Sequence, residues 1–327
     1  MICAVPSGQY SPATRSDTLW VVSTPSSDKV KATHLPLALT GMQVDITTRM
    51  GALAPATTTG FGQVDALLAG GLRTGTVISV TGVPGCGKTA FALLMAYMAA
   101  RSRAAVIFCS PILDETEVMA RLAARAMYRE YPDAETPYAA IWSGEAWQDD
   151  FTRQAVSTSV NVAVRKVGNL LHLFRVRPLE SSAELANAAA SLFARHERVV
   201  IVIDGFESFF AAAGGDAVRA AGVNADYSNR LSQVAYELKH MADSGCAVVV
   251  TSQAQTRQYL SPVSTADFEL ALADSTGMEF SRREASLGTR MVTLQVKKNR
   301  VGPLASVPLR FVAGSSVFES PYEDSEG

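Results

Sequence analysis

The sequence has 327 residues, of which 48% are hydrophobic and 18% are charged, and this composition predicts a globular protein with a large core. No apolar run is long enough to cross a membrane, and the first residues lack the basic and then apolar pattern of a secretory signal, so we expect an intracellular protein without a membrane partner. The net charge of −2 excludes a uniformly basic nucleic-acid-binding protein, so any such binding must use a local patch.

The first part of the chain shows little regular pattern. Residues 1–54 are rich in Ser, Thr and Pro, and we interpret them as an N-terminal arm of a core that spans residues 55–318. Residues 58–72 predict a short helix that ends at two glycines. The β-branched run 77–81 then predicts a buried strand, and the apolar segment 90–96 predicts a helix packed on it.

A glycine-rich loop joins that strand to that helix. It matches G-x-x-x-x-G-K-[ST] at every fixed position, with the residues Gly82, Val83, Pro84, Gly85, Cys86, Gly87, Lys88 and Thr89, followed by Ala90. The glycines allow the backbone to approach a phosphate, so that N–H groups and the positive end of the helix face the anion. Lys88 is expected to reach the β- and γ-phosphates and Thr89 to ligate Mg²⁺. The loop therefore predicts binding of a nucleoside triphosphate.

Alternating strands and helices follow the loop. Residues 104–109 predict a second buried strand and residues 115–129 a helix, an order that gives a βαβ crossover and a parallel sheet. Residues 131–168 have a blurred pattern, and we interpret them as an insertion with some helix. The strand predicted at 170–176 and the helix predicted at 183–194 then continue the alternation.

A second nucleotide signal lies at the end of the next strand. The apolar strand predicted at 198–205 carries Asp204 near its carboxyl end. An acid in this position lies at the crevice where α/β sheets bind ligands. We therefore predict that Asp204 holds Mg²⁺, through water, together with Thr89.

Two long loops follow in the last third of the chain. The first covers residues 211–226 and precedes a helix at 227–244, which leads into a buried strand at 246–251. The second covers residues 254–289, and its length indicates a functional or disordered segment. Two alternating segments then predict antiparallel strands that close the sheet, at residues 289–296 and 306–312.

Charge is unevenly distributed near the end of the chain. Residues 282–310 contain one acid, Glu284, and seven basic residues, which are Arg282, Arg283, Arg290, Lys297, Lys298, Arg300 and Arg310. Residues 319–327 form an acidic tail, which we interpret as a solvated surface. The basic segment 282–310 is therefore the local patch that nucleic-acid binding would require.

Across residues 55–318 the order of these parts resembles the RecA-like ATPase superfamily. The resemblance rests on T-G-x-x-x-[VL]-D-x-L-L-x-G-G-[LIV] at residues 59–72, on the phosphate-binding loop, on the strand with Asp204, and on Ser252-Gln253 after the strand at 246–251. It implies an α/β fold with a mostly parallel twisted sheet, helices on both faces and antiparallel strands at the C-terminal edge. It also implies ATP and Mg²⁺ as cofactors.

Two branches of the superfamily are similar to different parts of the chain. Residues 231–253, and Leu113-Asp114-Glu115, resemble the archaeal RadA proteins, the eukaryotic strand-exchange recombinases and their paralogues. By contrast, Lys298-Asn299-Arg300-Val301-Gly302-Pro303 resembles the K-[NQ]-R-x-G segment of DnaB-type replicative helicases and bacterial RadA.

Each branch implies further functional residues. In recombinases the loops at 211–226 and 254–289 would face DNA, and the single basic residue of the first, Arg219, favours a paralogue over the principal recombinase. In helicases Lys298 and Arg300 would reach the γ-phosphate of a neighbouring subunit as an arginine finger. The alternative for these two residues is an exposed basic strand end.

The residue that activates water for hydrolysis is the open point. Family members carry a glutamate just after the second strand, whereas Ser110-Pro111-Ile112-Leu113 stands here, followed by Asp114 and Glu115. Asp114 takes the recombinase position in an ungapped alignment, and Glu207 is an alternative. The shorter side chain of Asp114 predicts slow hydrolysis, because a misplacement of about 1 Å can cost on the order of 100-fold in rate. Gln253 is expected to sense the γ-phosphate and to pass its state to the following loop.

From these features we expect an ATP- and Mg²⁺-binding protein of the recombinase-paralogue type, acting in homologous recombination and DNA repair. It would be a DNA-dependent ATPase that binds single-stranded DNA through the two loops and the basic segment 282–310, and that assembles with like or related subunits. The alternatives are a ring-forming DnaB-like helicase or translocase and a regulatory ATPase subunit that binds no DNA. We expect a nuclear location in a eukaryote and a cytoplasmic one in a bacterium or virus.

Overall fold

The computed structural model describes residues 47–48, 56–131, 135–174, 182–206, 224–253, 265–275 and 281–321. The chain divides into two units, Met1–Gly51 and Ala52–Gly327, and every element described below belongs to the second. The predicted N-terminal arm therefore lies outside the described residues, apart from Thr47 and Thr48. None of the helices in the described ranges is both long and apolar enough to span a bilayer.

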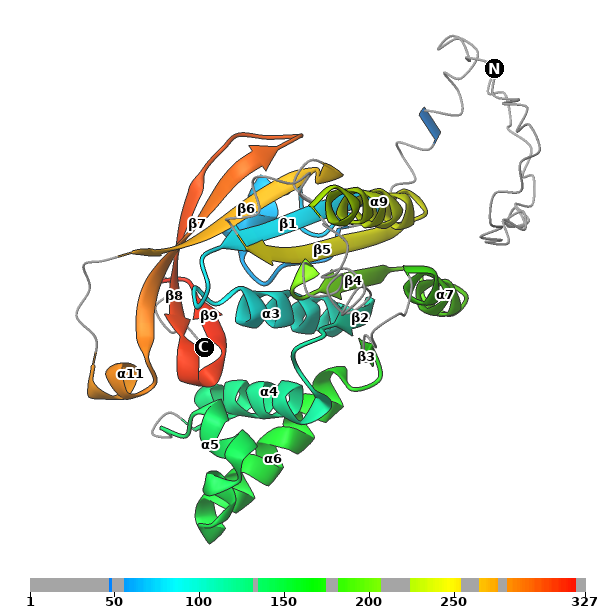
Figure 1. The fold of residues 1–327 in the computed structure, drawn as a ribbon. Helices are drawn as coiled ribbons and strands as arrows, with labels where there is room; N and C mark the ends of the chain where they lie inside the picture. The colour runs from blue at the N-terminus through cyan, green and yellow to red at the C-terminus, as the bar shows by residue number, and fades with distance from the viewer. Residues whose placement is uncertain are drawn as a thin grey trace, which may run out of the picture. The chain divides into compact units, whose positions relative to one another are not determined.

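A nine-stranded sheet forms the centre of the second unit (Figure 1). Its strands, in chain order, are β1 (Thr76–Gly82), β2 (Ala105–Cys109), β3 (Leu171–Phe174), β4 (Val199–Ile203), β5 (Cys246–Gln253), β6 (Phe268–Ser275), β7 (Thr289–Asn299), β8 (Ser306–Val312) and β9 (Val317–Glu319). Their order in space is β3-β2-β4-β5-β1-β6-β7-β8-β9. Strands β3 to β6 of this order are parallel, and β7, β8 and β9 continue antiparallel. The predicted α/β fold, with antiparallel strands at the C-terminal edge, is confirmed.

Helices cover both faces of this sheet. They are α2 (Gly62–Leu67), α3 (Lys88–Arg101), α4 (Glu115–Glu130), α5 (Tyr138–Ser143), α6 (Asp150–Val167), α7 (Ser182–Phe193), α9 (Asn224–Asp243) and α11 (Arg282–Ser286), with the 3-10 turns η2 (Glu145–Trp147) and η4 (Ala313–Ser315). A separate hydrophobic core lies on each face of the sheet, and strand β2 contributes to both. Val106 and Phe108 belong to the core under α3, whereas Ala105, Ile107 and Cys109 belong to the core under α7 and α9. Successive strand residues point to opposite faces, so an apolar run buried on both sides becomes a central strand.

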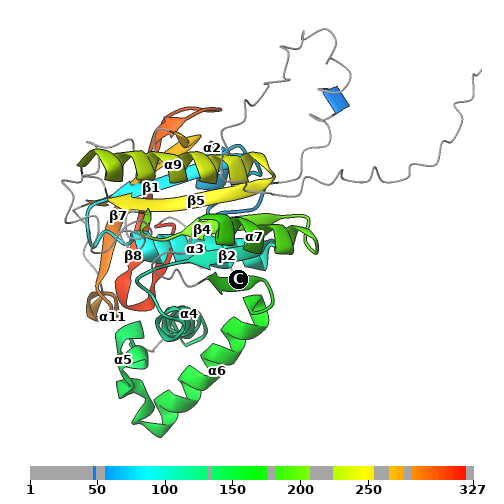
Figure 2. The same cartoon turned by 45° about the vertical axis from the view of Figure 1, so that its right-hand side comes forward.

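The segment 131–168, interpreted from sequence as an insertion with some helix, is mostly helical. Helices α5 and α6 and the turn η2 pack with α4 around a small core of their own, which includes Met127, Ile141 and Val156 (Figure 2). Helix α6 begins after Asp149, whose carboxylate accepts a hydrogen bond of 2.8 Å from the Thr152 N–H and so caps the helix.

The prediction of one long loop at 254–289 was wrong in part. Residues 268–275 form β6, which lies between β1 and β7 in the interior of the sheet. Phe268, Leu270 and Leu272 are buried and the residues between them are half-buried. Glu269, two alanines and Ser275 occupy the alternate positions, and Asp274 interrupts the apolar face, so the two-residue period was too weak to be recognised as a strand.

Three other boundaries also differ from the predictions. Helix α9 begins at Asn224, so the end of the predicted loop 211–226 is helical. Strand β7 continues to Asn299, and β9 was not predicted. Glu319, assigned from sequence to the acidic tail, is the last residue of β9, where it pairs with Arg310 of β8.

Candidate functional site

The glycine-rich loop lies at the carboxyl end of β1, between β1 and α3. A Cβ at Gly82 would come within 2.5 Å of the Cys86 sulfur and 2.8 Å of the Leu272 carbonyl oxygen on β6. Gly87 precedes α3 with a φ of 98°, and a Cβ there would lie 2.8 Å from the ring of Phe311. The pattern of glycines therefore has a steric cause at both positions.

Lys88 is the first residue of α3 and folds back over this loop. Its Nζ donates hydrogen bonds of 2.9 Å to the carbonyl oxygens of both Gly82 and Val83. The N–H groups of the first turn of α3, which have no partner within the helix, lie beside the same loop, where the helix dipole is positive. Burial raises the pKa of the Cys86 thiol in the loop, so this side chain is uncharged and contributes to packing. The loop thus offers an ammonium and backbone donors to an anion.

Asp204 lies directly across from the loop, just after β4. The Thr89 hydroxyl donates to its Oδ1 at 3.1 Å, and the Thr251 hydroxyl of β5 donates to the same oxygen at 3.0 Å. Ser110, which follows β2, donates to Oδ2 at 3.4 Å. The carboxyl ends of β1, β2, β4 and β5 therefore meet at one carboxylate, as expected for the crevice of a parallel sheet.

The environment of Asp204 fits a hard cation. Its side chain is buried, and this burial raises the pKa of the carboxyl group, while the hydrogen bonds from Thr251, Thr89 and Ser110 lower it. A carboxylate and a threonine hydroxyl side by side are the kind of oxygen donors that bind Mg²⁺, with waters and phosphate oxygens completing the octahedron. Thr89 and Asp204 could therefore hold Mg²⁺.

Sequence reasoning missed three residues of this site. Ser110 and Thr251 orient Asp204, and both stand at or near the end of a strand that neighbours β4, which was an available signal. Arg290 of β7 is the third. Its guanidinium donates to the Gly85 carbonyl oxygen of the loop and, at 2.9 Å, to Asp274, and it lies over the ring of Phe311. No pattern links Arg290 to the loop, because they are 205 residues apart.

Two of the three candidate general bases, Asp114 and Glu115, lie within the described residues. Asp114 caps α4 by accepting a hydrogen bond of 2.7 Å from the Glu117 N–H. Asp114 and Glu115 line a cavity of about 280 Å³ together with Ser110, which contacts Asp204. The side chains of both are exposed. The third candidate, Glu207, lies outside the described residues.

Gln253 is the last residue of β5 and is paired in register with Gly82. Its backbone is thus placed beside the start of the phosphate-binding loop, as a γ-phosphate sensor would require. Its side chain, the loop residues 211–223 with Arg219, and residues 254–264 are outside the described part of the chain.

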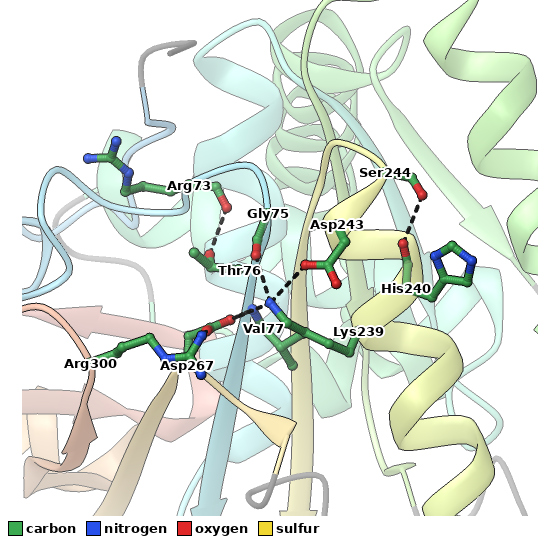
Figure 3. A network of polar contacts seen from close by, with 10 residues as sticks. All are labelled: Arg73, Gly75, Thr76, Val77, Lys239, His240, Asp243, Ser244, Asp267 and Arg300. Atoms are coloured by element: carbon green, nitrogen blue, oxygen red, sulfur yellow. Dashed lines mark hydrogen bonds and ion pairs between the residues drawn. The ribbon is translucent and has the colours of Figure 1, made fainter. Parts of the chain in front are cut away.

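Lys298 and Arg300 lie at the opposite end of the sheet. Lys298 is paired in register with Glu269, and Arg300 follows β7 and donates to Asp267 at 2.6 Å (Figure 3). The Asp267 carboxylate also accepts from the Val77 N–H at 2.9 Å, at the amino end of β1. Gly82 is five residues further along β1, which is roughly 17 Å at the rise of a strand. The two basic residues are therefore remote from the loop of their own chain.

The basic segment 282–310 does not form one surface. Arg290 contacts the phosphate-binding loop, and Arg310 donates to Glu284 at 2.6 Å and to Glu319. Lys298 and Arg300 lie at the other end of β7. The expectation of a single DNA-binding patch was wrong, because an antiparallel strand of 11 residues separates side chains that are close in sequence.

The fold and the site together define a phosphate-loop ATPase domain of the RecA-like type. Residues 56–320 match the family described as DnaB-like helicase C terminal domain, and the chain belongs to this family.

Two solved structures share the fold. One is described as the structure of a DnaB-like replicative helicase and its interactions with primase; it is 19% identical, with a TM-score of 0.63, over 86% of this chain and 67% of that one. The other is described as an ATPase domain and is 20% identical with a TM-score of 0.64, over 86% of this chain and 98% of that one. No curated protein sequence matches the chain.

These comparisons correct the functional expectation. The favoured interpretation from sequence, a recombinase paralogue in homologous recombination and repair, is contradicted by membership of a helicase family. The K-[NQ]-R-x-G segment at Lys298–Pro303 pointed to the right branch, whereas the similarity of residues 231–253 to recombinases did not.

Proposed function

We propose that this chain is the ATP-driven motor domain of a ring-forming DNA helicase of the DnaB type. The observation that carries the proposal is the contact between Thr89 and Asp204 behind a complete phosphate-binding loop, in a chain that belongs to the DnaB-like family. The substrates would be ATP and DNA, and the products of hydrolysis would be ADP and phosphate.

In this proposal the loop residues 82–90 bind the triphosphate. Lys88 exchanges its hydrogen bonds to the Gly82 and Val83 carbonyls for bonds to the β- and γ-phosphates, because a charge-assisted bond to phosphate is stronger than one to a neutral carbonyl. Thr89 and Asp204 would hold Mg²⁺, which neutralises phosphate charge when bound. Arg290 keeps the Gly85 carbonyl turned away from the anion.

The basic residues at the amino end of the sheet would serve the neighbouring subunit. Lys298 and Arg300 cannot reach the loop of their own chain, yet the Arg300 side chain is 65% exposed. A neighbour that places its phosphate-binding loop against this end would receive Arg300 as an arginine finger. The site is then incomplete in a single subunit, and assembly is part of the mechanism.

Hydrolysis in this domain would be slow. A glutamate just after β2 would orient the attacking water in related ATPases, whereas Ile112 and Leu113 occupy that stretch here. We assign the role to Asp114, with Glu115 as the alternative, since both line a cavity that they share with Ser110. DNA would be held by the segments 211–223 and 254–267, and Gln253 would link the second segment to the nucleotide.

Complementation between two inactive variants tests the proposal. Lys88→Ala removes the nucleotide site and Arg300→Gln removes the finger, so each variant alone should lack ATP-driven unwinding of a forked duplex. Subunits mixed in equal amounts create some interfaces with an intact site and an intact finger. We expect the mixture to regain on the order of a quarter of the DNA-stimulated ATPase activity, as random pairing predicts.

The control and the contrary outcomes are specific. Arg153→Gln on α6 removes an exposed arginine whose ion-pair partner is Asp150, and this variant should have the activity of the unaltered chain. Activity that never returns on mixing would contradict a finger shared between subunits. Nucleotide binding by the unaltered chain without DNA-stimulated hydrolysis or unwinding would instead support the regulatory ATPase.

A further inference from the structure

A second polar cavity lies away from the phosphate-binding loop. It has a volume of about 790 Å³ and lies among the second half of α3, the second half of α4, and strands β8 and β9. Five basic residues line it, namely Arg101, Arg125, Arg129, Lys166 and Arg310. On α3, Arg101 is 12 residues beyond Thr89, which is roughly 18 Å along the helix. The cavity, which we call the α3–α4 pocket, is thus separate from the proposed ATP site.

Arg125 is the central feature of the α3–α4 pocket. Its Nη1 is buried and has no hydrogen-bond partner among the described residues. A buried donor without a partner is unfavourable, and more so when it belongs to a charged group. Burial, with a further effect of the nearby Arg129, lowers the pKa of Arg125 to about 10, so the guanidinium is still charged at neutral pH. The site therefore holds a desolvated positive charge that lacks a counterion among the described residues.

The acids in and near the α3–α4 pocket are paired with basic residues other than Arg101 and Arg125. Glu319 is the one acid among the lining residues, and it pairs with Arg129 at 3.1 Å and with Arg310. Lys166 pairs with Glu130 at 3.3 Å. Within the described ranges, neither Arg101 nor Arg125 has a carboxylate at ion-pair distance. Instead, both guanidinium groups face the ring of Tyr97, at 5.9 and 5.1 Å from its centre.

The remaining wall of the pocket is apolar. Phe61, Leu94, Met98 and Phe318 contribute to it, beside the Tyr97 ring. A volume of this size lies within the range of small-molecule sites, and the basic lining favours an anionic ligand. Two guanidinium groups on one ring offer the paired N–H donors that match the oxygens of a phosphate.

We propose that the α3–α4 pocket binds a small phosphorylated molecule, with the phosphate on Arg101 and Arg125 and any organic part against the apolar wall. The shared chemistry is a phosphate group with two or more negative charges. Its source is either an inorganic polyphosphate or a phosphate ester, and a planar ring in the ester would lie beside Tyr97.

Binding is measured by isothermal titration calorimetry on the full chain carrying Lys88→Ala, which disables the phosphate-binding loop. Inorganic pyrophosphate and AMP, each without Mg²⁺, are the two probes. We expect at least one to bind with a Kd below about 1 millimolar, given two charge-assisted contacts. Tighter binding of pyrophosphate assigns an inorganic ligand, and tighter binding of AMP assigns an ester.

Variants then locate the bound phosphate. Arg101→Gln changes an exposed side chain, so the protein should fold normally and lose at least tenfold in affinity for the better probe. Arg125→Lys keeps the charge but removes the paired donors, and should have a similar effect. The matched control is Arg153→Gln on α6, outside the pocket, which should bind as the parent does. Absence of binding by the parent would overturn the proposal, and so would binding by Arg101→Gln and Arg125→Lys as tight as that of the parent.

Discussion

The polar groups at the two ends of the central sheet differ in what they bind. At the carboxyl end, glycines, backbone N–H groups, hydroxyls and Lys88 surround a space suited to an anion, and Asp204 is held by three hydroxyl groups. At the amino end, the carboxylate of Asp267 is buried and binds two cations, Lys239 at 3.2 Å and Arg300 at 2.6 Å (Figure 3). The first end is arranged for an external ligand, whereas the buried carboxylate at the second end finds its partners within the chain.

This difference separates binding from stability. Polar groups whose partner is an external ligand contribute little to the free energy of unfolding, so they can be replaced without unfolding the protein. A buried carboxylate with several donors is costly to disrupt, because each donor left behind loses its partner in a dry environment. Substitutions at the two ends should therefore affect different measurements.

The largest effect is expected at the carboxyl end. Lys88→Ala removes the charged donor to the phosphates and should weaken ATP binding at least ~100-fold, or about 3 kcal/mol, in a fluorescence titration with a labelled analogue. The thermal midpoint should change little. Lys297→Ala, an exposed lysine of β7, is the control. ATP binding at the unaltered affinity would refute the assignment of the loop.

At the amino end, Asp267→Ala should reverse this pattern. It leaves Lys239, Arg300 and the Val77 N–H without their acceptor, and we expect a loss of about 2 kcal/mol in the free energy of unfolding, reduced by the exposure of Arg300. Urea denaturation gives the value. ATP binding should be retained.

Asp243→Ala is the matched control for that substitution. Asp243 also pairs with Lys239, at 3.0 Å, but its side chain is 58% exposed, so the loss in stability should be within about 0.5 kcal/mol. Equal destabilisation by both changes would contradict the idea that burial of Asp267 is the decisive factor.

A smaller effect is expected for Asp114, where capping and catalysis can be separated. Asp114→Asn keeps an N-cap oxygen, so stability should stay within about 0.5 kcal/mol. Because Asp114 is the proposed base, the Asp114→Asn variant should have a single-turnover rate of hydrolysis at least ~10-fold lower, with ATP affinity unchanged. An unchanged rate would move the assignment to Glu115 or Glu207.

The smallest effect is expected for Arg290, which supports the loop from behind. Arg290→Gln removes the donor to Gly85 and the ion pair with Asp274, which is 55% exposed, so ATP affinity should fall about 5-fold. Arg282→Gln, an exposed change on α11, should have no effect. An Arg290 variant with normal affinity would show that the loop keeps its shape without this contact.

The sequence by itself determined the fold class and the carboxyl end of the sheet. The loop at residues 82–89 and the strand before Asp204 are local patterns, and their spacing in a βαβ order is enough to bring Thr89 and Asp204 together. Both were predicted, and the structure places their side chains 3.1 Å apart. The φ of 98° at Gly87 is likewise a property of the loop's own backbone.

Only the tertiary structure decided the rest. Strand β6 has a weak pattern of its own and exists because β1 and β7 provide hydrogen-bond partners on both sides. Three further features involve residues of different elements: the hydrogen bond of Arg290 to Gly85, the ion pair of Arg300 with Asp267, and the pocket that surrounds Arg125. Such contacts depend on strand order and register, which no short stretch of sequence encodes. The seven basic residues of 282–310 therefore formed one patch in sequence but several separate sites in space.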